Sequence, residues 1–185
     1  FIASDAVCDF LDEPTEQDTG SKTLNHVSGS LKFENIDVQY NQETRKALDN
    51  FNLEIQAGER VALVGRSGSG KTTVVNLLPR FVIPSHGKVL IDGENINNLT
   101  LANLREQFAL VSQDVFLFEG SLKDNVQYSR PNASDEEILA ALKAANLAEL
   151  VANHPDGLNQ AIGANGSQLS GGQRQRVSIA RAILK

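Results

Sequence analysis

The sequence contains no methionine and no tryptophan, and it has a single cysteine and five prolines. The one cysteine, Cys8, excludes an internal disulfide and is compatible with a reducing compartment. No apolar run approaches the roughly 18 residues that a bilayer-spanning helix needs, and no basic segment followed by an apolar stretch opens the chain. We therefore expect a soluble segment. Because the chain starts at Phe1 without a methionine, we also expect it to be part of a longer protein.

Acidic residues outnumber basic ones, 23 to 17, so the formal net charge is -6 and the sequence pI is about 5.1. This balance argues against a general nucleic-acid-binding surface. Two groups of residues could indicate a local nucleic-acid patch or a metal site. We interpret the last four basic residues as a solvated helix face and the three histidines, which lack metal-ligand spacing, as surface residues. The residues are Arg174, Arg176, Arg181 and Lys185, and His26, His86 and His154.

Strand and helix patterns interleave over the first two-thirds of the chain, which predicts an α/β fold. Residues 1–11 resemble the tail of a helix, residues 12–30 a polar linker, and the domain begins at residue 31. Apolar residues alternate over residues 31–40 with a one-residue shift that predicts a β-bulge near Asn35. Further strands are predicted over residues 48–55, 60–64, 87–91 and 108–111, with a turn at Asp92 and Gly93.

Helical patterns dominate after Gly120, and we expect a helical subdomain over about residues 120–170. Ser134 and Glu137 have the three-residue spacing of a capping box, and Ser121 and Asp124 have a weaker form of it. One apolar helix face is predicted after the first of these boxes. It consists of Ile138, Leu139, Leu142 and Ala145.

One glycine-rich stretch matches the pattern G-x-x-x-x-G-K-[ST], which cradles phosphate groups. It follows the apolar run at residues 60–64 and precedes helical spacing from Val74, as this loop requires. Its glycines allow backbone N–H groups to converge on a phosphate. Lys71 would reach the β- and γ-phosphates, Thr72 would offer its hydroxyl to Mg²⁺, and Thr73 would add another donor. The stretch consists of Gly65, Arg66, Ser67, Gly68, Ser69, Gly70, Lys71, Thr72 and Thr73.

A second anion site is predicted at the start of the last helix, where Leu169 is followed by Ser170, Gly171, Gly172 and Gln173. Ser170 and Gln173 again have capping-box spacing, so the serine hydroxyl and the glycine N–H groups lie at a helix N-terminus. By itself this pattern would equally be an ordinary helix cap. Two phosphate-binding ends in one chain favour a more specific interpretation.

These two stretches resemble the nucleotide-binding domain of ATP-binding cassette (ABC) transporters over residues 31–185, with the first as Walker A loop and the second as signature sequence. The resemblance implies a P-loop NTPase-type sheet core with an antiparallel β subdomain and an inserted helical subdomain. It also implies that Tyr40 stacks on adenine and that Gln113 contacts Mg²⁺ and the attacking water. Residues 163–166 occupy the loop that exporters place against their membrane helices. That loop usually has a glutamate where this chain has Ala164.

Within the family, residues 61–71, 101–105 and 110–113 are most similar to bacterial homodimeric lipid exporters. The resemblance implies an ATPase that binds ATP and Mg²⁺ between two head-to-tail copies of the domain. Its partners would be a second copy and a covalently linked transmembrane domain upstream, with no nucleic acid. It would lie at the cytoplasmic face of the bacterial inner membrane and export a lipid, lipid A-like, or another amphipathic substrate.

Family members place a strand ending in Asp-Glu shortly after the signature helix, where the glutamate polarises the attacking water. This sequence ends at Lys185, before that strand. Because phosphoryl transfer depends on positioning and electrostatics, we expect the 185-residue segment to bind ATP weakly and not to hydrolyse it. Two alternatives are a soluble ATPase of the same superfamily, acting in translation or DNA repair, and a binding-only structural fragment.

Overall fold

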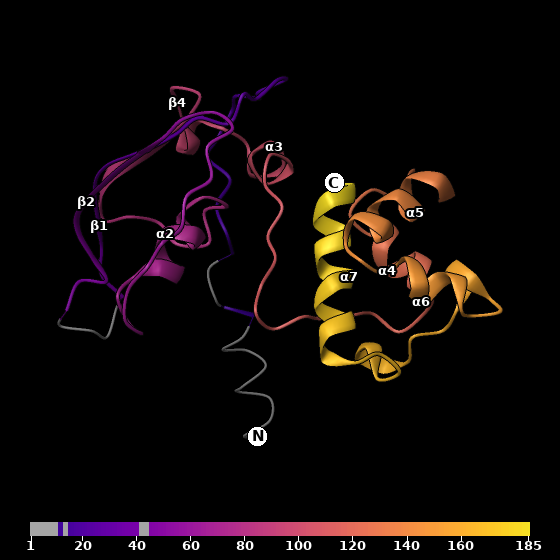
Figure 1. Cartoon of the computed structure of the whole chain (residues 1–185). Coiled ribbons are helices and arrows are strands. Elements are labelled where there is room, and N and C mark those ends of the chain that lie inside the picture. The colour runs from indigo at the N-terminus through magenta and orange to yellow at the C-terminus, as the bar shows by residue number, and fades with distance from the viewer. Residues whose placement is uncertain (1–10, 13–14, 41–44) are drawn as a thin grey trace. The chain divides into compact units, whose positions relative to one another are not determined.

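Four strands form an antiparallel sheet in the first of the two units into which the chain divides, residues 1–108 and 109–185. The computed structural model describes residues 11–12, 15–40 and 45–185. The strands lie in the order β2-β1-β3-β4, and Figure 1 shows β1 and β2 side by side. They are β1 (Leu31–Val38), β2 (Leu48–Ile55), β3 (His86–Ile91) and β4 (Glu94–Asn95). The predicted helix tail over residues 1–11 lies, apart from Leu11, outside the described residues.

The predicted bulge near Asn35 is confirmed. The register between β1 and both neighbouring strands shifts after Phe33 and Glu34, and Asn35 has a positive φ of 50°. The extra residue turns Ile36 and Val38 to the same side as Phe33, and all three are buried. The Asp92–Gly93 turn is also confirmed, because both residues have positive φ, as a two-residue turn between β3 and β4 requires.

Two predicted strands are wrong. Residues 60–64 and 108–111 form no strand in the structure. Val64 is 93% exposed and Leu110 is 51% exposed, so neither run is buried as a sheet interior would be. An apolar run becomes a strand only when a neighbouring strand satisfies its backbone N–H and C=O groups. The described strands pair with one another in the antiparallel sheet, and none pairs with these two runs.

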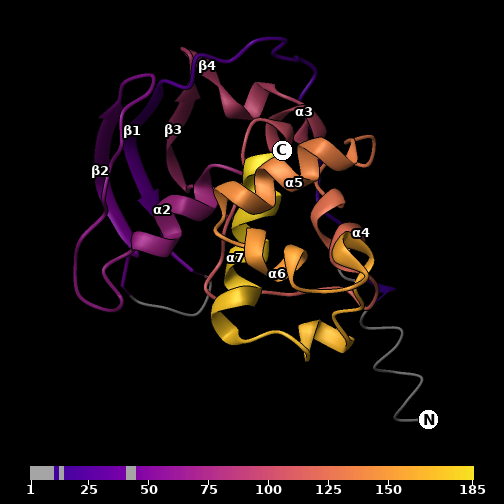
Figure 2. The same cartoon turned by 45° about the vertical axis from the view of Figure 1, so that its right-hand side comes forward.

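The helices of the first unit are short. They are α2 (Lys71–Leu77), the 3₁₀ turn η1 (Ile96–Asn98) and α3 (Leu101–Glu106). Figure 2 shows α2 beside the sheet, and buried Val74 and Leu77 of this helix belong to the same apolar core as the sheet residues. The linker is predicted over residues 12–30, and within it residues 15–30 are hydrogen-bonded to the rest of the first unit. Lys22 exchanges backbone hydrogen bonds with Asn98 and Thr100, and Leu24 pairs with the Asn103 side chain.

The second unit is helical, and the helices predicted after Gly120 are present. Its helices are α4 (Leu122–Gln127), α5 (Asp135–Ala144), α6 (Ala148–Ala152) and α7 (Gly171–Leu184), with 3₁₀ turns η2 (Gly157–Asn159) and η3 (Ala164–Gly166). All three predicted capping boxes are confirmed, because Ser121, Ser134 and Ser170 each exchange hydrogen bonds with the residue three positions later. Among the described residues, none of the helices has the length and apolar character needed to cross a bilayer.

Helix α7 packs against α4 and α5 around an apolar core that includes Leu122, Ile138 and Val177. Two predictions about this unit need correction. Leu139 does not belong to the buried face of α5, because it is 43% exposed. Arg181 does not belong to a solvated basic face, because its half-buried guanidinium donates to the Asn125 side chain and to two backbone carbonyls.

Candidate functional site

The phosphate-type loop adopts the backbone conformation that its glycines predict. Gly68 and Gly70 have φ of 77° and 86°, in the left-handed region that residues with a Cβ rarely adopt. Helix α2 begins directly after Gly70, and its first backbone hydrogen bond runs from Val74 N–H to Gly70 O. The N–H groups of residues 71–73 therefore have no acceptor within the helix. The loop and the first turn offer free backbone donors at one place.

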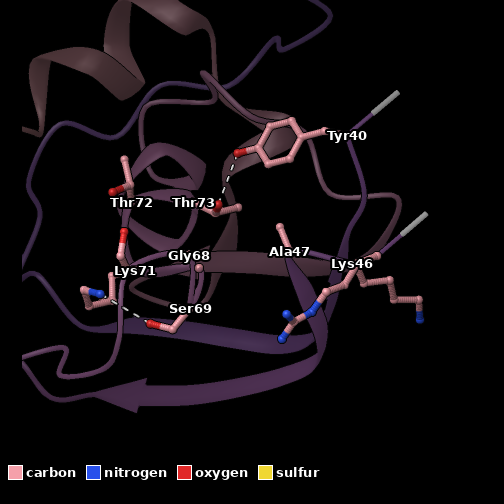
Figure 3. Close-up of a pocket in the computed structure, with 11 residues that line it drawn as sticks. Tyr40, Lys46, Ala47, Gly68, Ser69, Lys71, Thr72 and Thr73 are labelled. Atoms are coloured by element: carbon pink, nitrogen blue, oxygen red, sulfur yellow. Dashed lines mark hydrogen bonds between the residues drawn. The ribbon is translucent and has the colours of Figure 1, made fainter. Parts of the chain in front are cut away.

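Lys71 is folded onto its own loop. Its Nζ donates to the carbonyl oxygens of Gly65 and Arg66 at 2.9 and 2.8 Å. It also donates to Ser69 Oγ at 3.3 Å, the contact drawn in Figure 3. An ammonium group has three donors, and these three acceptors satisfy them without an anionic side chain. A bound anion would compete with neutral acceptors for this ammonium, and charge-assisted hydrogen bonds are the stronger kind.

A cavity of about 550 Å³ opens over this loop. Tyr40 lies on one side of it and the phosphate-type loop on the other (Figure 3). The predicted residues that line it are Tyr40, Ser67, Gly68, Ser69, Gly70, Lys71, Thr72 and Thr73. The structure therefore brings Tyr40 to the predicted loop, although they are far apart in sequence. An aromatic ring, an ammonium group, hydroxyls and free backbone donors suit a ligand with both a planar ring and phosphate groups.

Three further residues line the cavity and were missed from the sequence: Arg45, Lys46 and Ala47. They come from the end of the β1–β2 hairpin, as Tyr40 does. The sequence pattern could have indicated these three residues, because they directly precede the predicted strand at Leu48, whose hairpin partner ends near Tyr40.

Lys46 contacts two carboxylates, whereas the three acceptors of Lys71 are neutral oxygens. Its Nζ contacts Asp49 at 2.7 Å and Asp37 at 3.0 Å, and these hydrogen bonds raise the pKa of Lys46. The pKa of Asp37 is lowered, first by the backbone N–H of Asn50 and then by Lys46. Two carboxylates already neutralise this ammonium. Among the residues that the structure describes, no carboxylate contacts Lys71, the other lysine that lines the cavity.

The second predicted anion site lies in the second unit, at the start of α7. Gln173 N–H donates to Ser170 Oγ at 3.2 Å, and Ser170 N–H donates to Gln173 Oε1 at 2.8 Å. The Ser170 hydroxyl accepts in this capping box, so its own proton remains available as a donor. Gly171 and Gly172 are exposed beside it.

Neither the backbone conformation nor the packing within the second unit requires glycine at positions 171 and 172. Neither residue has a positive φ. A Cβ on Gly171 would have its nearest neighbour, an Arg174 nitrogen, at 4.0 Å. A Cβ on Gly172 would lie 3.6 Å from an Arg176 nitrogen, which is ordinary contact. Glycine weakens a helix relative to alanine. The surface over these residues is open, as a close approach from outside would require.

Gln113 and the start of α7 share a second cavity, of about 520 Å³. Gln113 is exposed, and the cavity is also lined by Asp114, Asn165, Gly171 and Arg174. Sequence reasoning named Gln113 and Gly171 separately and did not place them together.

Residues 163–166 are held against the segment that follows Gln113. Asn165 Oδ1 accepts the Leu117 backbone N–H at 3.0 Å, and a Cβ on buried Gly166 would lie 2.5 Å from Leu117 Cδ1. Ala164, at the position where exporters usually have glutamate, is exposed. The loop is therefore fixed at its base, and Ala164 faces solvent.

The family model described as ABC transporter matches residues 48–185. The ATP-dependent lipid A-core flippase of Neisseria gonorrhoeae is 63% identical over 185 residues, covering 100% of this chain and 30% of its own length. The protein of the same name from Methylobacillus flagellatus is 48% identical over 184 residues, covering 99% of this chain and 32% of its own length. The chain thus spans about a third of the length of these relatives.

A solved structure is also similar to this chain. It is titled "Structure of a bacterial Atm1-family ABC exporter with ATP bound". The TM-score is 0.89 at 37% sequence identity, over 99% of this chain and 32% of that one. This likeness confirms the predicted mixed α/β fold class, with its antiparallel sheet and helical part, although the strands at residues 60–64 and 108–111 are not formed.

Proposed function

Because this chain belongs to the ABC transporter family, a family of nucleotide-binding domains, we propose that it binds ATP and Mg²⁺ in the cavity between Tyr40 and residues 67–73. The observation that supports the proposal most directly is that Tyr40 and residues 67–73 line the same cavity. Tyr40 offers a ring on which a base can stack. The loop offers backbone donors, hydroxyls and the ammonium of Lys71 to phosphates.

Each predicted residue has a role in this proposal. Lys71 exchanges its three neutral acceptors for the β- and γ-phosphates, and the backbone of residues 65–70 surrounds them. Thr72 is exposed at the first turn of α2, where its hydroxyl can ligate the metal. Mg²⁺, when bound, would be held by the Thr72 hydroxyl and would neutralise negative charge on the phosphates. Gln113 is proposed to contact the metal and to orient the attacking water.

We propose that the site is completed by a second copy of the domain, arranged head to tail. The exposed start of α7 supports this, because Gly171 and Gly172 leave room for a close approach that nothing within their own unit uses. The Ser170 hydroxyl, these two glycines and Gln173 would contact the γ-phosphate held by the partner's loop. ATP then binds between two copies, and its hydrolysis separates them.

For the whole protein, we propose an ABC exporter that moves a lipid of the lipid A type. The relatives at 63% and 48% identity carry the name lipid A-core flippase, and this chain corresponds to about a third of their length. In this proposal residues 1–30 lead from a membrane domain into a nucleotide-binding domain over residues 31–185. The domain lies at the cytoplasmic face of the bacterial inner membrane, and hydrolysis resets the membrane helices.

Isothermal titration calorimetry with Mg-ATP tests the site in this chain. We expect Lys71→Ala to abolish binding, because it removes the ammonium that neutralises the phosphates. Lys46→Ala is a matched control, because it removes a lysine from the same cavity whose charge is already neutralised by Asp37 and Asp49. It should weaken binding far less. Equal losses in the two variants, or no loss in Lys71→Ala, would overturn the assignment of the phosphate loop.

The activity of the whole protein requires a separate experiment. The full-length protein in lipid vesicles should hydrolyse ATP and move a lipid A-type lipid between leaflets, and Lys71→Ala should remove both activities. Hydrolysis without lipid movement would reject the proposed cargo and leave the ATPase intact. Lipid movement that persists in Lys71→Ala would reject the coupling to ATP.

A further inference from the structure

The Tyr40 hydroxyl and Thr73 Oγ1 are 3.1 Å apart and form a hydrogen bond in which either can donate. Figure 3 shows the Tyr40 ring with its hydroxyl pointing at Thr73. Thr73 lies in the first turn of α2 and is only 7% exposed, whereas Tyr40 is 41% exposed. A buried, well-fixed hydroxyl therefore holds the free end of a half-exposed ring.

A second contact fixes the same hairpin end to the same loop. A Cβ on Gly70 would lie 2.6 Å from the Ala47 carbonyl oxygen, so the two backbones are in close contact. Ala47 N–H in turn donates to Val38 O at 2.8 Å, which joins the two sides of the hairpin. The position of Tyr40 thus depends on contacts with the residues that would hold the phosphates.

We propose that Thr73 is a positioning residue for Tyr40, and that its hydroxyl holds the ring ready for a base to stack on. The proposal rests on the ATP-binding function proposed above. A ring that is already fixed loses less rotamer freedom when a base binds, so binding is tighter. This role differs from that of a phosphate donor in the first turn, which is what the sequence predicts for Thr73. In this role the Thr73 hydroxyl strengthens the binding only of ligands that carry a base.

Two ligands separate these roles. Mg-ATP carries a base, and Mg-tripolyphosphate carries the phosphates alone. We expect Thr73→Val, which keeps the shape and removes the hydroxyl, to weaken Mg-ATP binding about three- to tenfold, the usual range for one lost hydrogen bond. Binding of Mg-tripolyphosphate should change little. Tyr40→Phe removes the same hydrogen bond from the other side and should give the same result.

The double variant and one conservative variant complete the test. If Thr73 acts through Tyr40, Thr73→Val combined with Tyr40→Phe binds Mg-ATP no more weakly than either single variant. Thr73→Ser keeps a hydroxyl and should restore most of the affinity. Calorimetry on this chain measures all four variants, and circular dichroism reports whether each is folded. If Thr73→Val does not fold, Tyr40→Phe still removes the same hydrogen bond, and its binding of the two ligands tests the proposal.

Four outcomes overturn the inference or its basis. Equal weakening of the binding of both ligands by Thr73→Val would show that Thr73 contacts phosphate directly. Additive losses in the double variant would show that Thr73 acts independently of Tyr40. Unchanged Mg-ATP binding in both single variants, with binding abolished by Lys71→Ala, would reject the positioning role and leave the proposed function intact. Wild-type chain that binds neither ligand would reject the proposed function itself.

Discussion

Ser30 donates both its backbone N–H and its hydroxyl to Asp92 Oδ1, at 2.8 and 3.0 Å. The backbone N–H groups of Ser28 and Gly29 donate to the same carboxylate. Ser30 directly precedes β1, and Asp92 directly follows β3 in the β3–β4 turn. The Asp92 side chain therefore joins the segment that precedes β1 to the turn between β3 and β4.

We expect Asp92→Ala to lower the free energy of unfolding by about 1–2 kcal/mol, comparable to the loss of a side chain that caps several backbone donors. Urea denaturation of this chain at neutral pH measures the loss. Asp49→Asn is a suitable control, because Asp49 is 75% exposed and contacts Lys46 in a surface ion pair, which contributes little. A loss no larger than that of the control would mean that the carboxylate does not stabilise the sheet.

The Asp92 contribution should also depend on pH. Burial raises the pKa of this carboxyl, but the hydrogen bonds from Ser30, Ser28 and Gly29 outweigh that effect and hold the pKa below its usual value of 3.8. A lowered pKa in the folded state stabilises the fold above the usual value, and the contribution disappears as the pH falls through the lowered pKa. The difference between wild type and Asp92→Ala should therefore be full at neutral pH and shrink below about pH 4.

The side chain of Asn125 makes a buried hydrogen-bond network in the second unit. It is 0% exposed, accepts from Phe118 N–H and from Arg181, and donates to the carbonyls of Phe118 and Ser121. Burial lowers the pKa of Arg181, whose guanidinium depends on these neutral oxygens. We expect Asn125→Ala to cost about 2–4 kcal/mol, because it leaves several buried polar groups without partners.

Lys123→Ala is the matched control for Asn125→Ala, since it changes the same helix but removes a surface ion pair with Asp135. Its expected cost is below about 1 kcal/mol. Chemical denaturation followed by circular dichroism compares the two variants. Equal costs would show that water replaces the lost Asn125 partners and that the network contributes little.

The sequence predicts local features of this fold well. The boxes at Ser121, Ser134 and Ser170 depend on a spacing of three residues, and the bulge at Asn35 on a one-residue shift, so each could be recognised within a short window. Residues 60–64 show the limit. Their apolar composition is typical of a strand, but whether a strand forms depends on a partner that composition does not specify.

In the candidate site, too, local features could be predicted from the sequence and long-range contacts could not. Residues 65–73 are contiguous, so their loop could be identified from order and spacing alone. Contacts between distant positions could not. Thr73 is bonded to Tyr40, which lies 33 positions earlier, and Arg181 donates to Asn125, which lies 56 positions earlier. Such pairs depend on how elements pack, and a single sequence carries no direct signal of them.

Gly68 and Gly70 provide a matched pair for testing the loop. Both have positive φ, so alanine at either position costs roughly 1–2 kcal/mol of backbone strain. A Cβ at Gly68 would meet nothing within 4 Å, whereas a Cβ at Gly70 would also collide with Ala47 O at 2.6 Å and a Leu48 methyl at 2.8 Å. We expect Gly70→Ala to destabilise the chain more than Gly68→Ala and to move the hairpin end that carries Tyr40. Thermal unfolding and Mg-ATP calorimetry measure both effects, and equal effects would contradict the close contact.

Alanine at Gly171 or Gly172 should act in opposite directions on stability and on activity. The fold has room for a Cβ at both positions, and alanine favours the helix, so each variant should gain about 0.5 kcal/mol in unfolding free energy. If a second copy brings its bound ATP against this surface, the added methyl groups separate the two copies, and ATP hydrolysis by the full-length protein should fall at least tenfold. Denaturation curves and steady-state ATPase rates give both numbers for the same variants. A gain in stability without a loss of hydrolysis would mean that nothing approaches α7 closely at its start. The head-to-tail dimer would then lose its structural support, while ATP binding at Lys71 would be unaffected.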